Sequence, residues 1–135
     1  MNPPSHFDQL LRAAAAQPER QRLLFVFASA ELPDDATAAQ RESHAAGLGG
    51  ALTPLMCVDK APEDLADFAA LADEAHTAGP PWQVVFAAAL SGRAGHPPEA
   101  ALIEETLQRM VERVRSGQVE GLLALGASGD PLTFD

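Results

Sequence analysis

Residues 23–28 read Leu23-Leu24-Phe25-Val26-Phe27-Ala28, an unbroken apolar run directly after the polar, mostly charged residues 19–22. A short apolar run without alternation is typical of a strand that is buried on both faces. Such a strand needs covering layers on each side of its sheet. The segment therefore predicts a layered domain built around a central sheet.

Three further segments are typical of strands, and helical patterns separate them. They are residues 52–59, with Leu55-Met56-Cys57-Val58 at the centre, residues 82–90 and residues 122–125. We expect residues 52–59 to form a second buried strand. Residues 132–134 are a candidate for a short fifth strand, joined to the fourth by a turn at residues 127–130.

Helix signals stand in three places. Ser5 and Asp8 have the spacing of a capping box and precede an apolar stripe, so they predict a helix that Pro18 ends. Residues 62–64, Pro-Glu-Asp, have the composition of a helix start. Residues 101–115 carry the clearest amphipathic pattern of the chain.

Strands that alternate with helices predict a small α/β layered domain, and residues 1–135 fit a single domain. In a second layout the first two strands pair antiparallel and residues 33–50 form a long loop, which makes the domain α+β with a mixed sheet. Residues 33–50 decide between the two layouts. Their alanine-rich part favours a helix by propensity, but it lacks a stripe of large apolar residues.

The two halves of the chain resemble each other. A Phe-x-x-Leu pair (residues 7–10 and 68–71) precedes a Val-Phe-Ala-x-Ala run (residues 26–30 and 85–89) in each half. The match predicts a duplicated α-β-α-β unit, and in that case both halves should have the same strand order. The alternative is two ordinary buried elements in an alanine-rich sequence.

The chain is strongly acidic, with a formal net charge of −10. Nucleic acids bind clustered cations, so we expect no nucleic-acid partner. We expect no membrane partner either, because the chain has no polybasic patch and no apolar stretch near the ~20 residues of a membrane span. The single cysteine, Cys57, and the absence of a secretory signal pattern indicate a cytoplasmic protein.

The best candidate for a ligand site is the loop that contains Ser91, Gly92, Arg93, Gly95 and His96. It lies between a predicted strand and a predicted helix, and ligands of open α/β sheets bind beyond the carboxyl ends of strands. Two glycines leave backbone amides free, and the arginine and histidine add donors, which suits a carboxylate or a phosphate. A plain turn with an exposed arginine is the alternative, because the loop is neither G-x-G-x-x-G nor a P-loop.

No complete catalytic motif is present. Ser91 is not part of a G-x-S-x-G elbow, and none of the four histidines forms an H-x-x-x-H pair. Asp73 and His76 share a helix face, but two ligands make a poor metal site. Cys57 has apolar neighbours, so we expect a packing residue with a raised thiol pKa. We therefore expect no catalytic residue, metal or cofactor.

Charged residues follow two of the predicted strands at corresponding places. Glu31, Asp34 and Asp35 follow the first strand, and Arg93 and His96 follow the third. Opposite charges on equivalent loops suggest pairing across a dimer or with a partner. Solvated turns are the alternative, since surface ion pairs contribute little.

Residues 22–28, 55–60, 82–92 and 108–112 resemble a group of short bacterial proteins, and the resemblance covers nearly the full chain. Members of this group often carry the label of a ribonucleotide reductase alpha subunit. That enzyme needs a radical-forming cysteine, a redox-active cysteine pair and a large barrel, whereas this chain has one cysteine and no tyrosine. The resemblance therefore implies no catalytic residue here.

Absent motifs, an apolar core and acidic loops together favour a non-catalytic interaction or regulatory module of the bacterial cytoplasm. Its partner would be another protein or a second copy in a homodimer. The alternative is a small anionic-ligand-binding protein or enzyme that uses the Ser91 to His96 loop, with Asp59 as a further group.

Overall fold

The computed structural model describes residues 5–31 and 51–132, which form a small mixed α/β domain around one four-stranded sheet. The strand order is β2-β1-β3-β4. Along the chain the elements are α1 (His6–Ala15), β1 (Gln21–Glu31), β2 (Ala51–Lys60), the 3-10 helix η1 (Pro62–Asp64), α3 (Phe68–Ala78), β3 (Val84–Ser91), α4 (Ala100–Arg115) and β4 (Leu123–Gly126). The predicted fold class is thus confirmed.

All three strand pairings are antiparallel. The antiparallel pairing of β1 with β2 is the one that the second layout predicts, although that layout expected a mixed sheet. β2 and β3 run in the same direction, since both are antiparallel to β1, and α3 connects them across it. The alternation of strands and helices therefore comes from a β-α-β unit made of β2, α3 and β3, and β1 lies between its two strands in the sheet. The predicted helix or loop at residues 33–50 lies outside the described residues.

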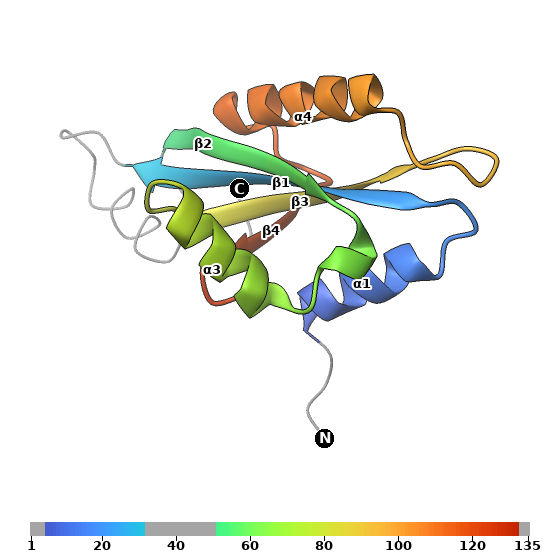
Figure 1. The fold of residues 1–135 in the computed structure, drawn as a ribbon. Coiled ribbons are helices and arrows are strands. Elements are labelled where there is room, and N and C mark those ends of the chain that lie inside the picture. The colour runs from blue at the N-terminus through green and yellow to red at the C-terminus, as the bar shows by residue number, and fades with distance from the viewer. Residues whose placement is uncertain (1–4, 32–50, 133–135) are drawn as a thin grey trace.

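Both faces of the sheet are covered, and Figure 1 shows α1 and α3 on one face and α4 on the other. Because side chains alternate along a strand, the apolar run of β1 divides between two cores. Phe25 and Phe27 pack with α1 and α3. Leu24 and Val26 pack with Leu107 and the rest of the α4 stripe. The central position of β1 explains why its run is apolar on both sides, as predicted.

The helix boundaries confirm two predictions and correct one. Ser5 caps α1 in a full capping box with Asp8, and α4 begins one residue before its predicted start. Residues 62–64 form only η1, because the chain returns to extended backbone at Leu65. The next helix begins at Phe68, where the side chain of Asp67 accepts a hydrogen bond from the Ala70 amide.

β2 corrects the expectation of a second buried strand. It is the outer strand of the sheet, and most of its side chains are half-buried or exposed. Leu55, Met56 and Val58 pack partly against the core on the α1 and α3 side. The sequence is misleading here because an apolar run marks contact with a core and not the number of neighbouring strands.

The predicted fifth strand is only partly present among the described residues. The chain turns after β4, and Leu125 and Pro131 form an isolated bridge. The Gly126 amide donates to the Asp130 carbonyl at 2.8 Å, and the Leu132 amide donates to the Ala124 carbonyl at 2.9 Å. The last residues of the predicted strand, 133 and 134, lie outside the described part of the chain.

The strand order agrees with the predicted duplication, but the sequence match does not. Each half contributes an outer and an inner strand, so the order β2-β1-β3-β4 is the same read from either edge. The match, however, aligns Val26 with Val85 and Phe27 with Phe86, and the members of each pair lie on opposite faces of the sheet. A two-fold axis perpendicular to an antiparallel pair of strands leaves each side chain on the same face of the sheet after the rotation. Residues on opposite faces are therefore not structural equivalents. The duplication itself stays a prediction.

Candidate functional site

The predicted ligand loop is a tight hairpin between β3 and α4. The Arg93 amide donates to the His96 carbonyl at 3.0 Å, and the His96 amide donates back to the Arg93 carbonyl at 2.8 Å. The two residues between them have positive φ angles, 51° at Ala94 and 79° at Gly95. This is the backbone of a two-residue turn in which a glycine is favourable.

The backbone amides of this loop are largely engaged, contrary to the expectation from its glycines. The Gly92 amide donates to the Arg20 carbonyl at 2.7 Å. The Gly95 amide donates to a Glu19 carboxylate oxygen at 3.3 Å. The Ser91 hydroxyl accepts a hydrogen bond from the Gln21 side chain at 2.8 Å. In addition, the sheet is antiparallel, so the rule about the carboxyl ends of parallel strands does not apply.

The side chains of Arg93 and His96 are exposed beside a hollow of about 470 Å³. Glu99 also lines this hollow and stands directly before α4. A carboxylate at the residue before the helix opposes a second anion at this end of it. The loop brings the predicted residues together, and ligand binding by it stays a prediction.

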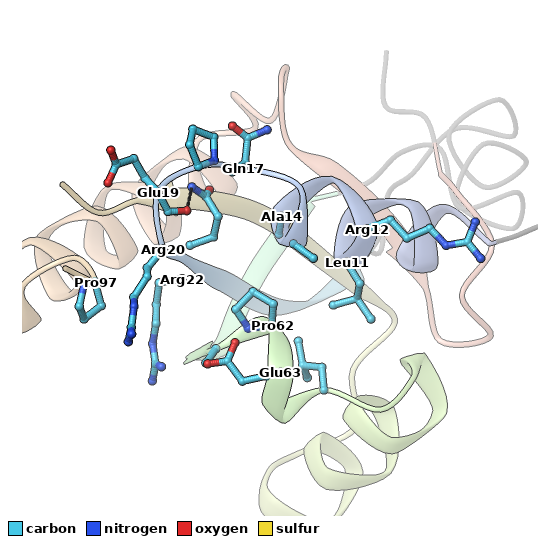
Figure 2. Close-up of a pocket in the computed structure, with 15 residues that line it drawn as sticks. Leu11, Arg12, Ala14, Gln17, Glu19, Arg20, Arg22, Pro62, Glu63 and Pro97 are labelled. Carbon is cyan, nitrogen blue, oxygen red and sulfur yellow. Dashed lines mark hydrogen bonds between the residues drawn. The ribbon is translucent and has the colours of Figure 1, made fainter. Parts of the chain in front are cut away.

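A larger hollow of about 800 Å³ lies next to the loop, and Pro97 lines both. α1, the start of β1 and η1 surround it (Figure 2). We call it the arginine hollow, because three of the nine cations of the chain line it, namely Arg12, Arg20 and Arg22. The sequence analysis missed it. The available signal was the pair of arginines at positions 20 and 22 in an otherwise acidic chain.

Two ion pairs connect this end of the sheet. Arg22 Nε lies 2.6 Å from Asp59 Oδ2, and both side chains are about one-third exposed. Lys60 Nζ lies 2.7 Å from Glu74 Oε1 and links β2 to α3. Asp59, which was expected to be a further ligand group, is therefore engaged with Arg22.

The histidine on α3 has a role that the sequence did not indicate. His76 stacks on Trp82, with ring centroids 4.8 Å apart and an interplanar angle of 13°. Trp82 is buried and also packs edge-to-face on Phe27. Among the described residues, no group of three or more His, Cys, Asp or Glu side chains is arranged to hold a metal.

Cys57 is exposed, which corrects its predicted role as a buried packing residue. It lies on the outer strand, on the opposite face from Met56 and Val58. Partial desolvation and, to a lesser extent, the Asp59 carboxylate raise the pKa of its thiol. The predicted direction of the pKa shift is therefore correct, but the thiol is accessible.

Most of the acidic residues that were expected to pair with Arg93 and His96 lie outside the described residues. Glu31 is the last residue of β1, and residues 34 and 35 are not among the described residues. None of the described helices is both long and apolar enough to cross a membrane.

We compared the chain with family models, with curated proteins and with solved structures, and none of them matches it significantly. The interpretation of the site therefore rests on the geometry of its own residues.

Proposed function

We propose that this protein is a non-catalytic interaction module of the bacterial cytoplasm that pairs with a second copy of itself through β2. The observation that carries the proposal is the position of β2, a ten-residue strand at the edge of the sheet. The outer edge of such a strand presents unpaired backbone donors and acceptors, which a second strand can satisfy.

The apolar side chains of β2 support a second copy as the partner. An antiparallel pair of identical strands has a two-fold axis perpendicular to the sheet, and this axis keeps each face on its own side. Leu55, Met56 and Val58 would then lie beside the same three residues of the second copy. Each of these side chains is only half-buried in one copy, so the pairing removes further apolar surface from water.

The charges near β2 do not oppose this pairing. Asp59 and Lys60 stand at its end, and each is already paired within its own copy, with Arg22 and Glu74 respectively. The electrostatic obstacle is the repulsion between two chains of net charge −10. Salt screens this long-range repulsion, so the dimer should be favoured by raising the ionic strength from about 0.01 M to 0.15 M.

Cys57 makes the pairing directly testable, because it is the single cysteine and is exposed on β2. If the two-fold axis passes near Met56 or Cys57, the two thiols lie roughly 4–8 Å apart. A short bis-maleimide should then link the chains into a covalent dimer. Sedimentation equilibrium of the untreated protein should give the mass of two chains.

Leu55→Lys tests the proposed interface on β2, and Leu102→Lys is its matched control. Leu102 on α4 is the large apolar side chain with the greatest exposure among the described residues, at 40%, and it is not part of the edge strand. Leu55→Lys places a charged ammonium group among the apolar side chains that the dimer buries, and it should weaken the dimer by about tenfold or more. Leu102→Lys should leave it intact. A monomer at all salt concentrations, or equal effects of the two variants, would refute the proposal.

A further inference from the structure

We propose that Arg20 and Arg22 form a binding site for the carboxylate of a small organic anion with an apolar body. The site lies in the arginine hollow, and none of the residues that line this hollow belongs to β2, so the proposal goes beyond the function proposed above. Guanidinium and carboxylate groups match each other in geometry and charge, and two guanidinium groups can hold both oxygens of one carboxylate.

Arg22 is held in place for such contacts. Its Nε donates to Asp59 Oδ2 at 2.6 Å, and this bond fixes the plane of the guanidinium group. A guanidinium group has five N–H donors, and the Asp59 bond uses one of them. The other donors have no partner among the described residues. The Arg22 side chain therefore loses little further conformational entropy when a ligand binds.

Arg20 is the unpaired member of the site. Its side chain is exposed and has no hydrogen-bond or ion-pair partner among residues 5–31 and 51–132. The acid next to it in the sequence, Glu19, instead accepts a hydrogen bond from the Gly95 amide. An unpaired guanidinium group in a chain of net charge −10 is a local site for anions in an otherwise repulsive field.

The two arginines lie close enough to act together. They are two positions apart on extended backbone, which spaces their Cα atoms by about 6.6 Å. Figure 2 shows their side chains next to each other and pointing the same way, between Pro97 and Pro62. A carboxylate between the two groups would therefore contact both.

The rest of the hollow restricts the ligand. Leu11, Ala14 and Leu65 give it an apolar wall that suits a hydrocarbon body. Glu63 also lines the hollow, and its carboxylate opposes a second negative charge on the ligand. The site therefore favours a monocarboxylate over a dicarboxylate or inorganic phosphate.

Hexanoate is a suitable probe, and binding can be followed through the Nε–H signals of the arginines in nitrogen-15 NMR spectra at constant ionic strength. We expect saturable shifts of the Arg20 and Arg22 signals with hexanoate. Hexan-1-ol, which lacks the carboxylate, should not produce them. Acetate, which lacks the apolar body, and inorganic phosphate should bind more weakly than hexanoate.

Arg20→Gln should weaken hexanoate binding by about tenfold, which is the loss expected for a charge-assisted hydrogen bond. Arg109→Gln removes the same charge from an exposed position on α4, and it should leave the affinity unchanged. Equal affinities for Arg20→Gln and Arg109→Gln would overturn the proposal, as would equal shifts with hexan-1-ol or shifts that never saturate. Tighter binding of phosphate than of hexanoate would refute the assigned ligand class.

Discussion

Gly92 should be the least replaceable residue of the loop between β3 and α4, although its flexibility is not the reason. A Cβ atom at this position would lie 1.9 Å from the His96 carbonyl oxygen and 2.9 Å from its carbon. The obstacle is backbone, so the hairpin must open to admit a methyl group. Opening it breaks the two bonds between Arg93 and His96, at 3.0 and 2.8 Å, and the 2.7 Å bond from the Gly92 amide to Arg20. At about 1 kcal/mol for each bond, Gly92→Ala should lower the free energy of unfolding by about 3 kcal/mol.

Gly95 is the matched control within the same turn. A Cβ atom there would have no other atom within 4 Å, but its φ angle is +79°. Gly95→Ala therefore introduces only backbone strain, which should cost about 1 kcal/mol. Gly95→Asn should cost less than Gly95→Ala, because asparagine tolerates left-handed backbone.

Urea unfolding followed by the fluorescence of Trp82, the single tryptophan, measures these differences. If the free energy of unfolding falls by about 2 kcal/mol for each molar urea, the urea concentration at the midpoint of unfolding should fall by roughly 1.5 M for Gly92→Ala and 0.5 M for Gly95→Ala. The order of the two variants is the decisive result. If Gly95→Ala were as destabilising as Gly92→Ala, the close contact between Gly92 and His96 would not be what holds the loop.

Three further results are expected. His76→Ala should change the fluorescence emission of Trp82, because it removes the imidazole ring that stacks on the indole at 4.8 Å and opens that face of the indole to water. Cys57 is exposed and should react with a disulfide reagent in the folded protein, but more slowly than free cysteine at pH 8, because its thiol pKa is raised. Asp59→Asn should accelerate this reaction, because it removes the carboxylate that contributes the smaller part of the rise in the thiol pKa. Ser5→Ala should lower the free energy of unfolding by about 1 kcal/mol in thermal or urea denaturation, because it removes the 3.0 Å bond to the Asp8 amide.

Much of the fold follows from local patterns in the sequence. The apolar run at residues 23–28 predicts a strand with two buried faces, and β1 has a neighbouring strand on each side and helices over both faces. The start of α1 follows from its capping box, whose hydrogen bonds involve only neighbouring residues. The burial of β2 was not predictable in this way. A strand at the edge of a sheet and a central strand both contact a core, and only the long-range pairing distinguishes them.

The candidate site illustrates the same limit. The sequence places Arg93 and His96 on one loop but does not indicate that the loop folds back on itself and uses its own amides. The arginine hollow needs α1, β1 and η1 to meet, and Arg22 needs the register of β2 to bring Asp59 within 2.6 Å. Contacts between residues this far apart in the chain leave no periodic signal.

The two edges of the sheet differ in a way that bears on how copies of the chain can associate. At β4 the chain itself returns along the strand, with the Gly126 and Leu132 amides donating to carbonyls across the turn. No described segment covers the outer edge of β2, but Pro54 and the bulge that leaves Leu55 without a partner on β1 limit regular pairing near the start of the strand. A sheet with one edge that its own chain crosses and one open edge can join a second copy once through the open edge. The association that this arrangement favours is therefore a closed dimer, because fibre growth would need two open edges.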